Sequence, residues 1–425
     1  MKLNSNLTRA LNGVFEKNIA PYASDNFVVN RLESTRAVAF SALQKEGAVA
    51  TGSVIGSADS LRSIIGKTGS YSTTIGAHPD FSHLKEGEED YGYCTSVFVD
   101  LKGSTLLARK LSLPQVKLIK NGLIKSAIEI FQAFDGHIQR LQGDAVFALF
   151  CRKGGVKEDS IIDAINATSI LQAFIQDALN PNFIDKGLPE ISARIGIDFG
   201  DDTEVMWSQY GLKDCNEITT TSLHTDLAAK LQAKAPSNGI MIGDNVRAML
   251  DLPDEFYEVK EVIRGGSPTK QRYAIKSDDY QYKMWSFRWH EYLRYFTISR
   301  SSDEALLSTI KTLKYTCKTR LPEEEKYSQN YLSGCGSLPK ETQLLFKIDI
   351  PREVRWNKIK WSVENRGSEA IEGEGRPSFE MEKFRNKTEC LQSTAYLGHH
   401  YMRCQVFNGN KVIADARFGV FVRAA

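Results

Sequence analysis

The feature that most constrains the fold is an alternation of short apolar segments with longer segments of helical period, between residues 94 and 235. The order is strand, helix, strand, strand, helix, strand, helix, at residues 94–99, 112–134, 137–142, 145–150, 158–179, 191–200 and 222–235. Helices that alternate with strands in this order cover one sheet. The pattern therefore predicts an α+β domain with a ferredoxin-like sheet.

The character of the sequence changes after about Gly336. Segments such as LFKIDI and KVIADARFGVFV have β periodicity, and Asn408-Gly409 is a typical hairpin turn. We therefore expect a C-terminal β-sandwich. The predicted organisation is a helical region with a Gly/Ser/Thr-rich linker, the α+β domain, a connecting helical segment and the sandwich, over residues 1–90, 91–275, 276–335 and 336–425.

Composition excludes several classes of protein. The 425 residues are 42% hydrophobic and 25% charged with a net charge of +2, so nothing indicates a nucleic-acid partner. No apolar run approaches the roughly 18 residues that span a bilayer, and no secretory signal precedes the first domain. The seven cysteines form no CxxC pair, which argues against zinc or a disulfide framework. We expect a cytoplasmic protein with reduced thiols and no membrane segment.

Two aspartates follow predicted strands of the α+β domain. Asp100 ends the first strand, and Asp144 lies in the turn of the predicted hairpin 137–150. Each has an ordinary explanation by itself, as a helix cap or as a turn residue. In a ferredoxin-like sheet, however, the first strand lies beside the hairpin, where two unpaired carboxylates would repel each other. Two bound divalent cations would remove this repulsion, and such metal pairs serve phosphoryl chemistry.

The residues that follow Asp100 predict an anion site. The segment LKGST connects a strand to a helix through a glycine, and successive backbone N–H groups at a helix N-terminus can bind a polyphosphate. Carboxylates and an anion-binding loop in one place indicate a nucleotide enzyme more strongly than either feature alone.

Four segments carry a resemblance to a known family. FVDLKGST, RLQGDAVFALF, ARIGIDFG and DLAAKLQA resemble, in this order, the motifs of the class III nucleotide cyclases over about residues 92–275. The resemblance implies that the α+β domain is a class III cyclase catalytic domain. It also implies the reaction, in which the ribose 3′-hydroxyl attacks the α-phosphate and pyrophosphate leaves.

The resemblance further implies roles for individual residues. Asp100 and Asp144 would bind two Mg²⁺ or Mn²⁺ ions per site, with the backbone carbonyl of Leu101 as a further ligand. The triphosphate would be lined by Phe98, Lys102, Gly103, Ser104 and Thr105. The protein would then contribute positioning and charge neutralisation rather than covalent chemistry.

Two residues depart from the family pattern where the base is recognised. Arg140 and Thr219 occupy positions that hold a Lys/Asp pair in adenylate cyclases and typically a Glu/Cys pair in guanylate cyclases. A guanidinium only donates hydrogen bonds, which suits the O2 acceptor of a pyrimidine, whereas a Thr hydroxyl can donate or accept. The pattern favours a pyrimidine and leaves CTP and UTP open, with a slight preference for UTP because uridylate cyclases are the commoner members of the family.

The last predicted helix also departs from the pattern. Asp226 occupies the position of the Asn that orients the ribose, and Lys230 that of the transition-state Arg. A lysine keeps the charge but loses the bidentate fork. The site therefore uses a modified arrangement, or the helix is out of register and another residue, such as His224, reaches in. Lys230 has a third explanation as a solvated residue.

The missing purine readers and the C-terminal sandwich make the chain similar to the pyrimidine cyclases of bacterial Pycsar anti-phage systems. This similarity implies a nucleoside triphosphate substrate and a homodimer with active sites at its interface. It also implies an effector that is activated by cyclic CMP or cyclic UMP and does not bind the enzyme. Two alternatives stay open: an adenylate or guanylate cyclase with an unusual base reader, and a catalytically inactive nucleotide-sensing module.

Overall fold

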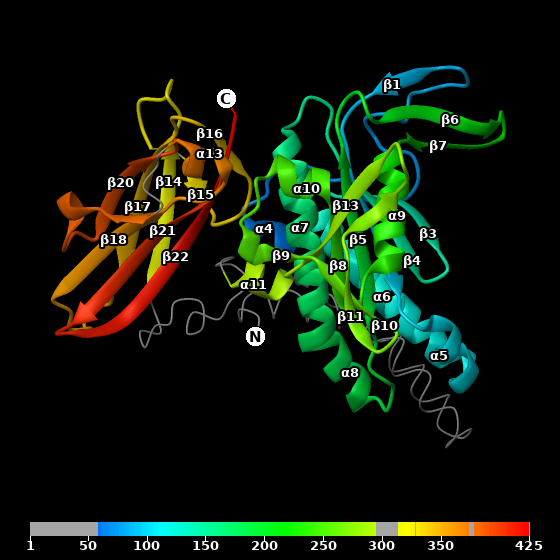
Figure 1. Cartoon of the computed structure of the whole chain (residues 1–425), viewed down its shortest axis with the longest axis horizontal. Coiled ribbons are helices and arrows are strands. Elements are labelled where there is room, and N and C mark those ends of the chain that lie inside the picture. The colour runs from blue at the N-terminus through cyan, green and yellow to red at the C-terminus, as the bar shows by residue number, and fades with distance from the viewer. Residues whose placement is uncertain (1–57, 295–312, 328, 374–377, 425) are drawn as a thin grey trace, which may run out of the picture.

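The computed structural model describes residues 58–294, 313–327, 329–373 and 378–424. Within them the chain forms an α+β domain and a C-terminal β-sandwich, which lie side by side (Figure 1). The helical region expected at residues 1–46 lies outside the described residues. In the described part of the chain, no helix is both long and apolar enough to cross a membrane.

The central sheet of the α+β domain has a ferredoxin-like core. Its strand order is β5-β2-β4-β3, and all three pairs are antiparallel. These strands are β2 (Cys94–Leu101), β3 (His137–Gln142), β4 (Ala145–Phe150) and β5 (Ala193–Gly200). The sequence predicted these strands and this arrangement, and the structure confirms both.

The sheet continues beyond β5. The strand β8 pairs with β5 in parallel, β13 pairs with β8 and β9, and β12 forms the edge. The bounds are β8 (Gly239–Gly243), β9 (Tyr257–Glu258), β12 (Tyr273–Lys276) and β13 (Gln281–Phe287). The segment 276–335 was expected to be a helical connection, but its first strand, β13, belongs to this sheet.

Helices cover both faces of the central sheet (Figure 1). The helix α6 (Leu113–Ala133) packs against α7 (Lys157–Phe174) on one face, and α9 (Leu223–Lys234) lies against β2 and β5 on the other. Pro114 in the first turn of α6 and the Ser112 N–H bond to the Gln115 side chain, at 3.0 Å, define where α6 begins.

A glycine allows α9 to approach the sheet closely. A Cβ atom at Gly196 of β5 would lie 2.1 Å from the Ala228 carbonyl oxygen and 2.2 Å from the Gln232 amide nitrogen. Both atoms belong to the backbone of α9, so they cannot move aside as a flexible side chain can. The helix therefore packs directly on the backbone of β5, beside the strand that carries Asp100.

Smaller elements surround this core. The three-stranded sheet β1-β6-β7 and the hairpin β10-β11 comprise β1 (Glu89–Tyr91), β6 (Met206–Leu212), β7 (Cys215–Thr221), β10 (Lys260–Arg264) and β11 (Ser267–Gln271). The short helices are α4 (Ala58–Ile65), α5 (Ser104–Lys110), the π-helical turn Ile175–Leu179, α8 (Asn180–Asp185), α10 (Asp244–Met249), the 3₁₀ turn Asp254–Phe256 and α11 (Trp289–Leu293).

The described part of the predicted linker is packed against the first domain. The side chain of Arg62 in α4 is almost completely buried, donates to two carbonyls at the end of α6 and forms an ion pair with Asp135. Three apolar side chains of α4 are also buried: Ala58, Leu61 and Ile65. The composition did not predict that α4 is packed, because the segment contains few apolar residues. The Arg62 guanidinium adds to their burial by donating to backbone carbonyls at the C-terminus of α6 that lack partners within the helix.

The C-terminal domain is a sandwich of two sheets, in the orders β15-β14-β17-β20 and β16-β22-β21-β18-β19. The strands are β14 (Lys314–Arg320), β15 (Gln329–Tyr331), β16 (Ser337–Pro339), β17 (Gln343–Asp349), β18 (Lys358–Glu364), β19 (Ser378–Glu380), β20 (Glu389–Ser393), β21 (Gly398–Asn408) and β22 (Lys411–Arg423). A short helix α13 (Ser368–Glu372) and a 3₁₀ turn Glu382–Phe384 join strands. The predicted turn at Asn408-Gly409 connects β21 and β22.

The sandwich begins earlier than expected. The strands β14 and β15 lie before residue 336, in the predicted helical connection, of which α11 is the described helix. In β14 only Cys317 and Thr319 are buried, and the sequence KYTCKTR is otherwise polar. A strand with so few apolar residues shows no clear alternation of apolar and polar residues. The sequence therefore placed the start of the sandwich too late.

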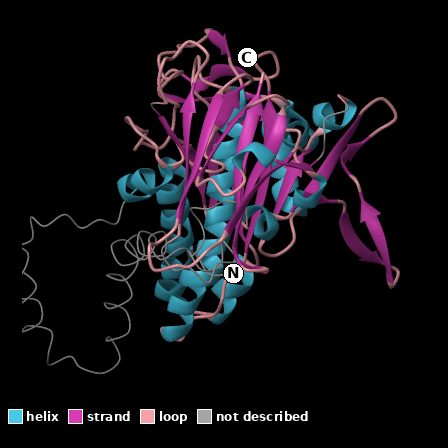
Figure 2. Cartoon of the chain, turned by 90° about the vertical axis from the view of Figure 1, so that its left-hand side faces the viewer, coloured by secondary structure: helices cyan, strands magenta, loops and turns pink. Residues whose placement is uncertain are grey.

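Buried contacts join the two domains, whose helices and strands Figure 2 shows in a second view. Tyr401 and Phe421 of the sandwich belong to the hydrophobic core of the first domain. Asn166 of α7 donates to the Gly334 carbonyl at 2.9 Å, and Asp159 accepts from the Ser337 N–H at 2.6 Å. The sandwich is therefore packed directly on α7 of the first domain.

Candidate active site

The two predicted carboxylates lie at neighbouring strand ends. Asp100 is the penultimate residue of β2. Asp144 lies between β3 and β4 and follows Gly143, whose φ is 66°. Val99 pairs with Val146 across the two strands. Continuing this antiparallel register puts Asp100 opposite Ala145, the residue that follows Asp144. The register thus places the two residues at the same end of the sheet, on neighbouring strands.

Each carboxylate has a cationic neighbour from another element. Oδ2 of Asp100 accepts from the guanidinium of Arg194 in β5 and, at 3.3 Å, from Nε2 of Gln232 in α9. Oδ1 of Asp144 lies 3.1 Å from Nζ of Lys120 in α6. The other oxygen of Asp144 is buried and has no hydrogen-bond partner among the described residues.

This oxygen and its surroundings fit a divalent cation. Mg²⁺ is usually held by one or two carboxylates together with substrate phosphates rather than by a complete cage of side chains. Within the described residues, no group of three or more His, Cys, Asp or Glu side chains is placed to bind a metal. A pair of carboxylates with one unsatisfied oxygen is therefore the arrangement that best fits a hard cation here.

The loop after Asp100 has the expected conformation. Gly103 has a φ of 77°, in the left-handed region that favours glycine, and α5 begins at the next residue. Lys102 is exposed, and its Nζ donates to Oγ of Ser237 at 2.8 Å. Ser104 is half-buried and Thr105 is exposed. These four residues are the segment that the sequence predicted to bind phosphate, and only Ser104 among them is partly covered.

Phe98 lies two residues before Asp100 on β2. Its ring stacks on that of Phe147 in β4, with 4.3 Å between ring centroids and an interplanar angle of 8°. The two phenylalanines are directly opposite each other in the strand register. The stack supports the β2–β4 pair immediately behind the carboxylates.

The position that the sequence predicted to read the base also contains an acid, Glu217, that the sequence analysis did not identify. Arg140 in β3 donates from Nε to Oε1 of Glu217 in β7 at 3.0 Å, and its second nitrogen bonds the other carboxylate oxygen. Gln139 also donates to Glu217, at 3.1 Å. Thr219 lies two residues after Glu217, on the same face of β7. Because residues two apart on a strand share a face, the prediction of Thr219 could also have identified Glu217.

The helix α9 presents two predicted residues to solvent. Asp226 and Lys230 are exposed and lie one turn apart. Gln232, which contacts Asp100, lies on a different side of the helix. Within one subunit, the side chains of Asp226 and Lys230 therefore do not share the face of α9 that reaches the carboxylates.

His224 does not reach into the site. Its Nδ1 lies 3.0 Å from Oδ2 of the fully buried Asp198, and its Nε2 lies 3.3 Å from Asn245. Burial lowers the pKa of His224, but the hydrogen bond and charge of Asp198 outweigh burial and raise the pKa above its ordinary value. The hydroxyl of Tyr282 also donates to Asp198, at 2.7 Å. This buried network anchors the first turn of α9 to the sheet.

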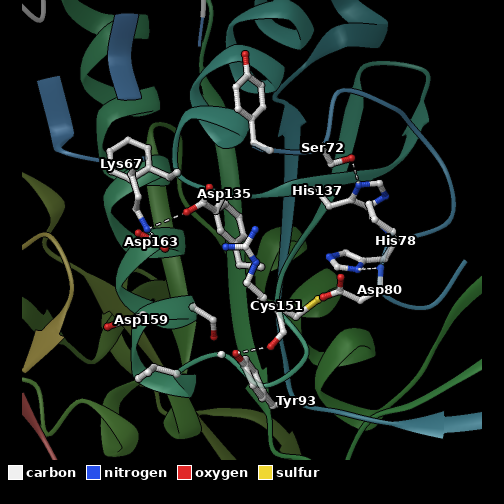
Figure 3. A pocket seen from close by; sticks show the side chains of 18 of the residues that line it. Lys67, Ser72, His78, Asp80, Tyr93, Asp135, His137, Cys151, Asp159 and Asp163 are labelled. Atoms are coloured by element: carbon white, nitrogen blue, oxygen red, sulfur yellow. Dashed lines mark hydrogen bonds and ion pairs between the residues drawn. The ribbon is translucent and has the colours of Figure 1, made fainter. Parts of the chain in front are cut away.

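A separate cavity of about 480 Å³ lies at the other end of the β3–β4 hairpin (Figure 3). None of the predicted site residues lines it. Its acids already have protein partners: Lys67 pairs with Asp135 and Asp163, and Asp159 accepts from Ser337. We therefore assign this cavity no part in catalysis.

Comparisons with known proteins identify relatives of this chain and a family model for its C-terminal part. Residues 290–423 match the family model described as the adenylyl/guanylyl and SMODS C-terminal sensor domain. A cytidylate cyclase of Staphylococcus aureus is 43% identical over 368 residues, which cover 85% of this chain and 86% of the relative. A cytidylate cyclase of Escherichia coli is 32% identical over 372 residues, covering 80% and 76%.

Solved structures align with the first domain only loosely. The crystal structure of the adenylyl cyclase CyaB from P. aeruginosa aligns over 47% of this chain and 95% of that chain, with 16% identity and a TM-score of 0.40. The sequence relatives, by contrast, extend through both domains. With 43% identity over most of both proteins, the chain belongs to the same family of class III nucleotide cyclases as these bacterial cytidylate cyclases, and it is a nucleotide cyclase.

Proposed function

We propose that this enzyme is a pyrimidine nucleotide cyclase that converts CTP to 3′,5′-cyclic CMP and pyrophosphate. The observation that carries the choice of CTP is the ion pair between Arg140 and Glu217 at the base-reading position. The names of the two cytidylate cyclase relatives support the same substrate. This proposal replaces the slight preference for UTP drawn from the frequency of uridylate cyclases.

The argument rests on the hydrogen-bonding edges of the two pyrimidines. Cytosine offers acceptors at O2 and N3 and a donor at its 4-amino group, whereas uracil offers an acceptor, a donor and an acceptor. Arg140 can supply two donors, and Glu217 can accept from the 4-amino group, as acidic side chains do when they read cytosine. Uracil would place its O4 acceptor against the Glu217 carboxylate, which repels it.

Asp100 and Asp144 would hold two divalent ions, Mg²⁺ or Mn²⁺, with the Leu101 carbonyl. The bound ions would supply Lewis-acid activation of the ribose 3′-hydroxyl and neutralise triphosphate charge. Arg194 and Lys120 hold the two carboxylates in position through the contacts described above. The loop from Lys102 to Thr105 and the ring of Phe98 would line the triphosphate.

A homodimer would complete each site. Asp226 and Lys230 are exposed on α9 and turned away from the side that contacts Asp100. In a head-to-tail pair of subunits, Lys230 would neutralise charge on the transferred phosphoryl group and Asp226 would orient the ribose, each in the site of the other subunit. Such a dimer requires exposed charged side chains on a helix beside the site, and Asp226 and Lys230 meet this requirement.

The product would act as a second messenger. We propose that cyclic CMP activates a separate effector in an anti-phage response, and the match of residues 290–423 to a sensor domain supports regulated synthesis. The enzyme would act in the cytoplasm, and its seven free cysteines fit that reducing compartment.

The test is to incubate the purified protein with Mn²⁺ and each of the four nucleoside triphosphates separately, and to identify the products by chromatography and mass spectrometry. We expect cyclic CMP to be the main product. Cyclic AMP or cyclic GMP as the main product would contradict a pyrimidine cyclase. Cyclic UMP as the main product would retain the pyrimidine reaction but contradict the role of Glu217, and no product from any substrate would favour an inactive sensing module.

A further inference from the structure

The β-sandwich contains a cavity of about 390 Å³ between its two sheets. Leu344 and Phe346 of β17 and Gln392 of β20 come from one sheet, and Val363 and Met402 come from the facing sheet. A volume of this size is within the range of about 300–1,000 Å³ that is typical of small-molecule sites. The cavity is far along the chain from the residues proposed for catalysis.

The lining of this cavity is apolar, with polar groups that carry no formal charge. None of its described lining residues is Asp, Glu, Lys or Arg. The amides of Asn365 and Gln392 and the hydroxyl of Thr394 are among its polar groups. Phe379 and Tyr396 add aromatic surface. A ligand with a net charge would find no oppositely charged side chain among these lining residues, so the cavity favours an uncharged ligand.

His400, the titratable imidazole in the lining, is held in its neutral form. Its Nδ1 accepts from the Arg366 N–H at 3.2 Å, so that nitrogen carries no proton. Its Nε2 then donates to the Tyr396 carbonyl oxygen, at 2.8 Å. Burial also lowers the pKa of His400 below its ordinary value. The cavity therefore keeps its uncharged character near neutral pH.

We propose that this cavity is a binding site for an uncharged aromatic small molecule that carries amide or hydroxyl groups. The aromatic side chains suit a planar ring, and the amide of Gln392 would bind one of its polar groups. This site lies outside the nucleotide site and goes beyond the proposed function. Its occupancy can be measured without any assay of cyclase activity.

One wall of the cavity continues into the contact between the domains. Asn365 lines the cavity, and the next residue, Arg366, forms an ion pair with Glu255 of the first domain. Two residues further on, the N–H and hydroxyl of Ser368 both bond Oδ2 of Asp251, at 2.5 and 2.9 Å. A ligand that moves this wall would therefore act directly on a contact with the first domain, which gives the site a route to regulate it.

The probe for the test is N-acetyl-L-tryptophanamide, which is neutral, aromatic and carries two amides. We expect it to bind the full-length protein with a Kd on the order of 0.1–1 mM in ligand-observed NMR, as its size allows. N-acetyl-L-tryptophan differs only in carrying a carboxylate at neutral pH. We expect it to bind at least about tenfold more weakly, because its charge would be buried without a partner.

Variants locate the bound probe. Ala395 is exposed at the cavity, so Ala395→Trp should obstruct it and weaken probe binding by about tenfold or more. Leu391→Trp is the matched control, since Leu391 is exposed on β20 and does not line the cavity. Gln392→Ala is a second test that removes one amide and should weaken binding a few-fold. Circular dichroism and thermal unfolding would verify that each variant is folded.

Three results would overturn the proposal. The first is no saturable binding of the neutral probe to the wild-type protein. The second is equal binding of the neutral and anionic probes. The third is probe binding that stays unchanged in both folded variants, Ala395→Trp and Gln392→Ala, because the probe would then be bound elsewhere.

Discussion

The candidate active site and the sandwich cavity are lined by opposite kinds of side chain. At the active site, Asp100, Asp144 and Glu217 each face a cationic side chain from a different secondary-structure element. In the sandwich, the described lining residues carry no formal charge. Paired ionic side chains can exchange partners with a charged substrate, whereas an uncharged, apolar cavity selects against charge.

If both proposals hold, the difference would let one chain bind two unlike ligands without competition between them. A nucleoside triphosphate would be disfavoured in the sandwich cavity by its charge, and an uncharged aromatic molecule would gain little from the ionic site. The contacts of Asp251 and Glu255 with the sandwich connect the two regions. These residues follow α10, which begins directly after β8 of the central sheet.

The largest effect is expected from removing a charge at the active site. Asp144→Asn should lower kcat/KM by at least about 100-fold, because the buried carboxylate oxygen is the group that best fits a cation. The formation of cyclic nucleotide from CTP, with Mn²⁺ saturating, measures the loss. Asp214→Asn is the control, since Asp214 is exposed in the turn between β6 and β7. If the Asp144→Asn enzyme were as active as the control, Asp144 would have no role in catalysis.

A smaller change should alter selectivity rather than activity. Glu217→Gln replaces an obligate acceptor by an amide that can also donate to O4 of uracil. The preference for CTP over UTP, measured as the ratio of the two kcat/KM values, should fall by about tenfold or more. Glu190→Gln, at an exposed position before β5, serves as control. An unchanged ratio would show that Glu217 does not read the base.

The link between the two regions should have a modest effect on stability. Asp251→Ala removes the acceptor of both Ser368 hydrogen bonds, and the free energy of unfolding should fall by about 1–2 kcal/mol. Calorimetry measures the change, with Asp278→Ala at an exposed position as control. Equal unfolding free energies for the two variants would mean that this contact does not hold the domains together.

The smallest effect concerns the buried pair beneath α9. The pKa of His224 is raised above 6.5 in the folded protein, so protonated His224 stabilises the fold below that pH and this contribution is lost as the pH rises through the folded-state pKa. Between pH 6.5 and 8.5 the free energy of unfolding should therefore fall, by about 1 kcal/mol or less.

Chemical denaturation at several pH values measures this slope. In His224→Gln the decline above pH 6.5 should be reduced, whereas His83→Gln, at an exposed position, should keep it. His78 does not contribute to this slope. Burial lowers its pKa to about 4, so its titration changes the free energy of unfolding below pH 6.5. A slope that is identical in both variants would contradict the role assigned to His224.

Some of the active site could be predicted from local sequence patterns. The strands β2 and β4, beside Asp100 and Asp144, are short apolar segments that are almost continuously buried, and short turns leave few ways to arrange a ferredoxin-like sheet. The hairpin at Asn408-Gly409 was also predictable, because Asn-Gly is a typical turn between two segments of β periodicity. The bounds of the sandwich were less predictable, because β14 buries only two of its seven side chains.

The sequence by itself determined the order of the elements, the family and the position of the two carboxylates at adjoining strand ends. Only the tertiary structure decided that Glu217 meets Arg140, 77 residues away, because β7 reaches the hairpin through a separate small sheet. It also decided that Asp226 and Lys230 face outward and that two sheets enclose an uncharged cavity. Local periodicity records which face of an element is buried, but it does not record which distant element covers that face.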